Sequence, residues 1–110
     1  MKLFTSEQMK HIDRYAIDTL QIPSVLLMKN AAYSVSQEAM RIMENDSVAV
    51  FCGSGNNGGD GIGAACYLKE RGLAVRVFLT GNREKMTPDS LAMEEWLKDV
   101  YKRQGKRIIE

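Results

Sequence analysis

The feature that most constrains this chain is residues 53–61, which read Gly-Ser-Gly-Asn-Asn-Gly-Gly-Asp-Gly and hold five of its nine glycines. The preceding residues 47–52 are a short, nearly continuous apolar run, which is typical of a buried parallel strand. Helical spacing of apolar residues follows from Gly61, and residues 74–79 form a second apolar run. Strand, glycine-rich loop, helix and strand in this order predict a βαβ unit.

The composition of this loop predicts an anion site. Glycine has no Cβ and tolerates positive φ, so a turn dense in glycine lets backbone N–H groups close on a bound anion. The start of the following helix adds partial positive charge. We therefore expect a phosphate-bearing ligand at residues 53–61.

Two common phosphate motifs fit this loop poorly. Gly53, Gly55 and Gly58 have the spacing of the dinucleotide fingerprint, but residues 79–81 read Leu-Thr-Gly where an acidic residue is expected to hold the ribose. No Lys-Ser or Lys-Thr pair follows the glycines, which excludes a Walker A loop. An ordinary NAD-dependent oxidoreductase is therefore disfavoured.

Two helices are expected before the first strand. Thr5 and Gln8 have the spacing of a capping box at the start of the first. Pro23 suits the first position of the second, and residues 45–46, Asn-Asp, end it. The second helix carries an i, i+4 apolar stripe, formed by Leu27, Ala31, Val35, Ala39 and Ile42.

The C-terminal part predicts one more helix and a strand. Residues 87–89, Thr-Pro-Asp, are a helix start, Gly105 is a helix end, and residues 107–110 start a third strand. Gly72 similarly suits the position after the helix that follows the glycine-rich loop.

Composition narrows the class of protein. The chain has 110 residues, 45% hydrophobic and 26% charged, which is ordinary for one globular domain or less. A net charge of +1 gives no field to steer nucleic acid or a membrane surface. Cys52 and Cys66 are expected to be buried thiols in a reducing compartment. Without a secretory signal or an apolar run near the roughly 18 residues of a membrane span, we expect a soluble, cytoplasmic protein.

The loop, residues 26–32 (Leu-Leu-Met-Lys-Asn-Ala-Ala), Met9 and Asp13 together resemble the YjeF N-terminal domain family, the NAD(P)H-hydrate (NAD(P)HX) epimerases. The resemblance extends over nearly the whole chain and implies an α/β, Rossmann-like three-layer αβα fold with a parallel sheet. It implies an isomerase of nucleotide repair that interconverts the R and S forms of hydrated NADH or NADPH. An ADP- or ATP-dependent dehydratase, fused or separate, then restores the S form.

The resemblance also implies roles for residues of the loop. The family's second loop Asn gives an oxygen to a potassium ion, a metal role that falls here on Asn57. A neutral amide oxygen suits potassium, which prefers carbonyl-type dipoles. The substrate-binding positions are Asn56, Asn57, Gly58, Gly59 and Asp60.

These loop residues also have simpler structural interpretations. The two asparagines can simply occupy turn conformations, because Asn tolerates the left-handed region and bonds its own backbone. The Asp60 carboxylate would be repelled by a pyrophosphate, so it either caps a helix that begins at Gly61 or contacts a substrate hydroxyl.

The resemblance stops at Glu110, and the family usually has Glu where this chain has Lys29. The family's catalytic aspartate and remaining potassium ligands lie in the second half of its domain, so it assigns no catalytic residue here. Residues 1–110 are therefore expected to be the N-terminal half of that domain, incomplete after the third strand. We expect the chain alone to be inactive, and the open edge of its first strand to favour association, with a homodimer in the whole protein.

A competing function belongs to another class. The YjeF-like domain of enhancer-of-mRNA-decapping proteins is similar, and there it serves as a non-catalytic scaffold for dimerisation and RNA binding. Charged runs at a helix end are usually solvated, so we do not expect nucleic acid at Lys98, Lys102, Arg103, Lys106 and Arg107. The intact loop favours the enzyme.

Overall fold

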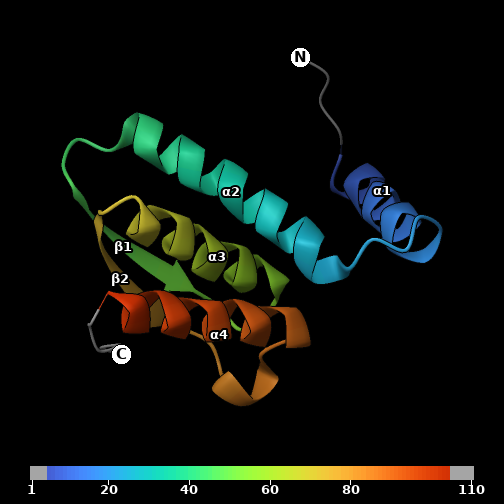
Figure 1. Ribbon diagram of the computed structural model, residues 1–110. Helices are drawn as coiled ribbons and strands as arrows, with labels where there is room; N and C mark the ends of the chain where they lie inside the picture. Colours follow the sequence, from blue (N-terminus) through green and yellow to red (C-terminus); the bar gives the residue numbers. More distant parts are fainter. Residues whose placement is uncertain (1–4, 105–110) are drawn as a thin grey trace.

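The computed structural model describes residues 5–104 as an α/β chain (Figure 1). Helices α1 and α2 come first, strands β1 and β2 flank α3, and a 3-10 turn, η1, precedes α4. The bounds are α1 Ser6–Asp18, α2 Ser24–Ile42, β1 Ser47–Cys52, α3 Asn56–Glu70, β2 Ala74–Leu79, η1 Arg83–Lys85 and α4 Pro88–Arg103. The predicted helix end at Gly105 and strand at 107–110 lie outside the described residues.

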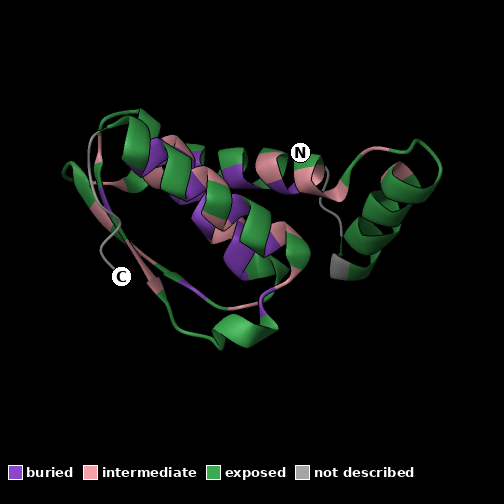
Figure 2. Ribbon diagram, turned by 60° about the horizontal axis from the view of Figure 1, so that its bottom comes forward, coloured by how far each residue is buried: buried purple, intermediate pink, exposed green. Residues whose placement is uncertain are grey.

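The two strands confirm the predicted βαβ unit. They pair in parallel, from Ser47 opposite Ala74 to Cys52 opposite Leu79, and α3 makes the crossover. Helices α2, α3 and α4 lie side by side on one face of this sheet (Figures 1 and 2). The βαβ unit therefore places the glycine-rich segment at the carboxyl end of β1, where ligands of open α/β sheets bind.

The two faces of the sheet differ in burial. Val50 and Cys52 point toward α3, whereas Phe51 is 68% exposed on the other face. Phe51 stacks on Phe78 with ring centroids 5.1 Å apart, and the Arg76 guanidinium lies over Phe78. No helix among residues 5–104 covers this second face (Figure 2). The described residues thus form two of the three layers that the resemblance implies.

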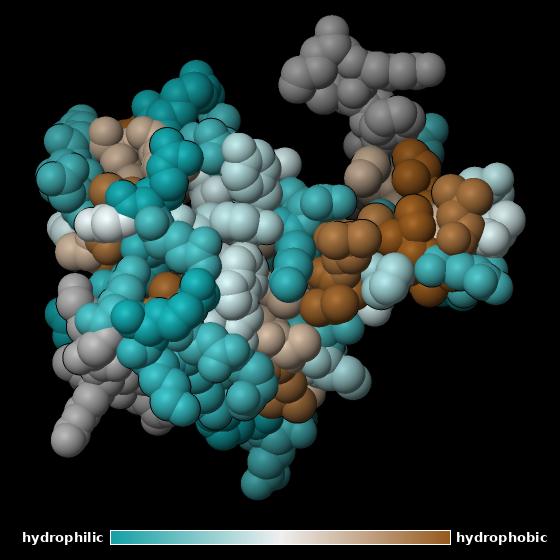
Figure 3. Space-filling model, viewed as in Figure 1, coloured by the Kyte–Doolittle hydropathy of each residue, from teal (hydrophilic) through white to brown (hydrophobic). Residues whose placement is uncertain are grey.

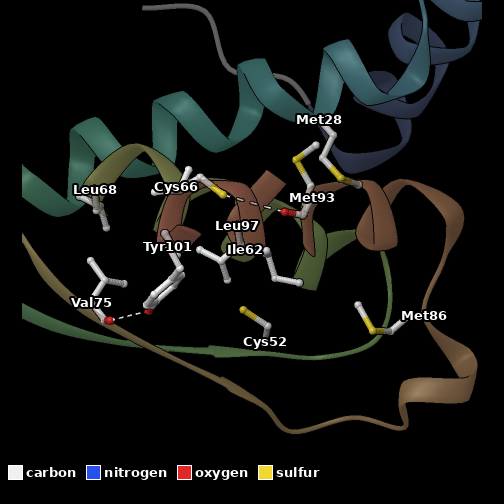
Figure 4. Packing of buried hydrophobic residues seen from close by; sticks show 12 residues of the cluster. Met28, Cys52, Ile62, Cys66, Leu68, Val75, Met86, Met93, Leu97 and Tyr101 are labelled. Atoms are coloured by element: carbon white, nitrogen blue, oxygen red, sulfur yellow. Dashed lines mark hydrogen bonds between the residues drawn. The ribbon is translucent and has the colours of Figure 1, made fainter. Parts of the chain in front are cut away.

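The core lies between α3, its neighbouring helices and the sheet (Figure 4). Its largest fully buried side chains, Leu68, Met93 and Val100, come from α3 and α4. The Tyr101 hydroxyl donates to the Val75 carbonyl at 3.0 Å. Cys52 and Cys66 are free and buried, as predicted. Burial raises the pKa of the Cys52 thiol to about 11 and raises that of Cys66 as well, so neither is poised as a nucleophile.

Several helix ends follow their sequence signals. Thr5 and Gln8 form the predicted capping box, with bonds of 2.9 and 3.1 Å. Thr87 caps α4, which begins at Pro88. Gly72 follows α3 with φ +87°, and its N–H bonds to the Lys69 carbonyl in a Schellman-type end. Pro23 is the N-cap of α2 and not its first helical residue, so α2 begins one residue later than predicted, at Ser24.

The predicted apolar stripe of α2 is wrong as a guide to its buried face. Val35 is 48% and Ile42 69% exposed, while Met28, Ala32 and Ser36 are buried one position further along. Apolar side chains occupy both faces of α2, so periodicity alone does not choose between them. Contact with α3 determines which face of α2 is buried, because Ala32 lies close to Gly63 of α3. The Ser36 hydroxyl can lie in this contact because it donates to a carbonyl of its own helix.

Helix α1 lies apart from the helical layer, beside the N-terminal end of α2 (Figure 1). Its His11 is exposed. Apolar side chains gather on α1 and the start of α2 (Figure 3), among them Met9, Ile12, Leu20 and Leu26, each between 43% and 56% exposed. None of the described helices is long and apolar enough to cross a bilayer.

Candidate functional site at the start of α3

The glycine-rich segment is mostly helical, which corrects the prediction of a nine-residue loop. Only residues 53–55 separate β1 from α3, which begins at Asn56 after the N-cap Gly55. The prediction that Asp60 caps a helix beginning at Gly61 is therefore wrong. The two asparagines are the first residues of helix α3, so the hypothesis that they occupy left-handed turn conformations is wrong as well. Asn and Gly are poor helix formers, so contacts elsewhere must set this start.

One such contact is a close approach of two backbones. A Cβ on Gly58 would lie 1.9 Å from the Gly53 carbonyl oxygen, so only glycine fits this first turn of α3. A Cβ on Gly53 or Gly55 would meet nothing within 4 Å. Gly58 is thus required by the fold, while Gly53 and Gly55 leave open space beside the backbone.

That open space adjoins an uncapped helix start. Gly55 has no side chain to cap α3, and its carbonyl accepts the first helical bond from the Gly59 N–H at 3.1 Å. The earlier N–H groups of the helix have no intrahelical acceptor, and they lie at the positive end of the helix dipole. This arrangement can bind phosphate oxygens.

The N-terminus of α4 holds the loop from the other side. The Thr87 N–H donates to the Ser54 carbonyl at 3.3 Å, and the Ser90 hydroxyl donates to the Gly55 carbonyl at 2.8 Å. The Thr87 hydroxyl donates to Asn56 Oδ1 at 2.6 Å. Sequence reasoning identified Thr87 only as the start of a helix and missed Ser90, which is fully buried.

The end of β2 provides a third support. The Thr80 N–H donates to the Cys52 carbonyl at 2.8 Å. A Cβ on Gly81 would lie 2.7 Å from the Ser54 nitrogen. Residues 79–81 therefore pack on the glycine-rich loop, which explains why a small residue stands where a dinucleotide fold of the ordinary kind places an acid.

Four of the five predicted substrate residues divide into two groups, and Asp60 is half-buried. Asn56 and Asn57 are exposed, whereas Gly58 and Gly59 are buried and offer only backbone. The Asn57 side chain has no hydrogen-bond partner among the described residues. Lys29, where the resemblance predicts Glu, has its Nζ 5.0 Å from the centre of the Trp96 ring.

Asp60 is half-buried on α3. Burial raises the pKa of its carboxyl group, and the Asp13 carboxylate of α1 raises this pKa further. The structure thus brings Asp13 electrostatically close to the glycine-rich segment. Within residues 5–104 there is no group of three or more His, Cys, Asp or Glu side chains that could hold a metal ion. Any cation here would depend on amide, hydroxyl or backbone oxygens together with single carboxylates.

The raised pKa of Asp60 makes stability depend on pH in a defined direction. The folded protein binds this proton more tightly than the unfolded chain, whose Asp pKa is about 3.9. The free energy of unfolding therefore falls as the pH rises from the pKa of the unfolded chain to the higher pKa of the folded protein. We expect Asp60→Asn to raise the midpoint of urea unfolding at pH 7 and to leave it nearly unchanged at pH 3. The exposed Asp46→Asn is the control; an equal gain from both variants at pH 7 would contradict the assignment.

Comparison with known proteins places this geometry in a family. The model of the family described as YjeF-related protein N-terminus matches residues 24–108. An NAD(P)H-hydrate epimerase of Limosilactobacillus reuteri (strain ATCC 55730 / SD2112) is 40% identical over 96 residues, which are 86% of this chain and 45% of that protein. A bifunctional NAD(P)H-hydrate repair enzyme Nnr of Moorella thermoacetica is 35% identical over 99% of this chain and 21% of its own length.

A solved structure is similar as well. The crystal structure of yeast ynu0, YNL200c, matches with a TM-score of 0.71 at 26% identity, over 91% of this chain and 45% of that one. The chain therefore spans about half the length of this protein and of the Limosilactobacillus epimerase, and a fifth of the Moorella enzyme. It belongs to the YjeF-related protein N-terminal family, as its loop and neighbouring segments implied.

Proposed function

We propose that this chain supplies the substrate loop of an NAD(P)H-hydrate epimerase, an isomerase that interconverts the R and S forms of hydrated NADH or NADPH. The observation that carries the proposal is the uncapped start of α3 beside the open backbone of Gly53 and Gly55. Relatives named NAD(P)H-hydrate epimerase share this part of the chain and support the choice of ligand.

In this proposal the loop binds and orients the dinucleotide. Backbone N–H groups at the start of α3 donate to phosphate oxygens, and the buried Gly58 and Gly59 let the backbone fold tightly enough to present them. Asp60 accepts a hydrogen bond from a substrate hydroxyl at the edge of the site. No residue of 5–104 is assigned a catalytic role.

A potassium ion fits the donor set of this segment. Asn57 has a free amide oxygen, and Asp60 lies one helical turn further on the same face of α3. Amide and carboxylate oxygens are the ligands that such a cation takes. We assign the metal role to Asn57, and the ion would supply positive charge next to the bound phosphates.

Asn57→Ala should weaken potassium-dependent binding of hydrated NADH by about tenfold without changing the fold, because it removes one ligand from an exposed position. Titration in potassium and in sodium buffers measures the difference. Gln37→Ala, which removes an exposed amide on α2, is the control and should bind like the wild type. Unchanged potassium dependence in Asn57→Ala would refute the metal assignment.

The partners follow from the same proposal. Bifunctional repair enzymes among the relatives support a dehydratase that acts on the product, fused to this domain or separate. We also propose a cytoplasmic homodimer as the working form. A scaffold that binds RNA is less well supported, because described basic residues of α4 pair with acids: Lys98 with Glu95 at 3.2 Å and Arg103 with Glu70 at 3.1 Å.

Separate binding titrations test the function against that alternative. Hydrated NADH, NADH and a single-stranded RNA are titrated separately into the purified protein in potassium buffer. We expect hydrated NADH to bind and RNA not to bind at the same protein concentration. RNA binding without dinucleotide binding would favour the scaffold and overturn the proposal.

A further inference from the structure

We propose that Thr87 is a positioning residue that turns the Asn56 amide so that its nitrogen, not its oxygen, faces the ligand. This inference rests on the proposed function, because it names how one side chain of the same loop meets the dinucleotide. The two adjacent asparagines then have opposite polarity: Asn56 donates hydrogen bonds to ligand oxygens, and Asn57 offers an oxygen to the cation.

The hydrogen-bond chain at Thr87 fixes this orientation. Its Oγ1 accepts the Ser90 N–H at 3.2 Å, as an N-cap does, and lies 2.6 Å from Asn56 Oδ1. A hydroxyl carries one proton, and the shorter distance is typical of an O–H···O bond. Two acceptors lie within reach of the Thr87 proton: Asn56 Oδ1 at 2.6 Å and Ser90 Oγ at 3.0 Å, the latter donating its own proton to the Gly55 carbonyl. The shorter distance assigns the Thr87 proton to Asn56 Oδ1.

The orientation leaves the Asn56 Nδ2 group available. Asn56 is exposed, and its two amide N–H groups have no hydrogen-bond partner among the described residues. Asn56 is also the first residue of α3, where the backbone N–H groups lack acceptors. Side chain and backbone thus present donors together, which suits phosphate oxygens and repels a cation.

Thr87 is held firmly enough to act in this way. Its own N–H bonds to the Ser54 carbonyl at 3.3 Å, and Ser90 is fully buried below it. The start of α4 therefore contacts three successive residues of the loop, Ser54, Gly55 and Asn56. Because Thr87 is already ordered at a capped helix end, little conformational entropy is lost there when a ligand binds.

The test compares Thr87→Val, which removes the hydroxyl at nearly constant shape, with Thr87→Ser, which keeps it. NMR of the ligand-free protein follows the Asn56 side-chain amide, and titration with hydrated NADH gives Kd. Thr87→Val also removes the cap of α4, so Thr5→Val is the matched control, since it removes an equivalent cap from α1.

We expect Thr87→Val to shift the Asn56 amide signals and to weaken binding about tenfold, the effect of one hydrogen bond, while Thr87→Ser stays within about twofold. In an Asn56→Ala background Thr87→Val should have no further effect on Kd, whereas a general loss of stability would persist there. Asn56→Asp should abolish binding by repelling phosphate.

Three results would overturn the inference: unchanged Asn56 signals in Thr87→Val, additive effects in the double variant, or tighter binding by Asn56→Asp. The amide signals are read without ligand, so they decide the positioning even if hydrated NADH does not bind. Failure of the wild-type protein to bind would contradict the proposed function alone.

Discussion

Gly58→Ala is expected to abolish binding of hydrated NADH and to lower the free energy of unfolding by about 2 kcal/mol or more. The new Cβ would lie 1.9 Å from the Gly53 carbonyl oxygen and 3.0 Å from its nitrogen, both backbone atoms. Alanine gains roughly 1 kcal/mol over glycine in a helix, which is less than such a clash costs. The loop must therefore move away from α3, and chemical denaturation with ligand titration measures both effects.

Gly53→Ala is the matched comparison, because its Cβ would meet no protein atom within 4 Å. Its stability should change by less than about 0.5 kcal/mol, yet binding should weaken if ligand occupies the open space beside this backbone. A Gly58→Ala protein of wild-type stability would refute the close backbone approach. Wild-type affinity in Gly53→Ala would place the ligand elsewhere.

Gly63→Ala should cost about 2 kcal/mol of stability through the contact of three helices, without a direct effect on the loop. The added Cβ would lie 2.6 Å from Ala32 Cβ on α2 and 3.2 Å from Met93 Sδ on α4. Methionine can bend away, whereas a Cβ cannot move without its backbone. Helix α2 is therefore expected to be displaced from α3.

A second-site change tests this explanation. Adding Ala32→Gly to Gly63→Ala removes the clashing atom and should restore stability, less about 1 kcal/mol for glycine in a helix. Adding Ala31→Gly instead carries the same helix cost at an exposed position and relieves nothing. Equal stability of the two double variants would mean that the clash with Ala32 is not the cause.

The sequence predicted those parts of the fold that local signals control. Strands 47–52 and 74–79, the caps at Thr5 and Thr87 and the end at Gly72 agree with it, because each follows from hydrophobic runs or from residues with one preferred conformation. The start of α3 did not follow from such signals. Its Asn and Gly residues disfavour helix, and contacts with Gly53 and with Thr87 and Ser90, more than 30 residues away, set the boundary.

The sequence predicted a place for the candidate site but not its local geometry. Motif and resemblance predicted substrate-binding residues at 56–60, after the end of β1, and this assignment stays a prediction. They did not show that Gly58 serves the fold while Gly53 faces open space, nor that Thr87 contacts Asn56. The buried face of α2 could not be predicted either, since apolar residues lie on both sides of this helix. Ala32 is on the buried face because it packs against Gly63 of α3.

The proposed function requires the start of α3 to bind a hydrated nicotinamide dinucleotide. The most direct measurement is a titration of isotope-labelled protein with hydrated NADH, followed by NMR of backbone amides in potassium buffer. We expect the largest shifts to fall on residues 53–60 and Gly53→Ala to reduce them. Absence of shifts at saturating ligand, or shifts confined to residues away from this segment, would contradict the proposed function.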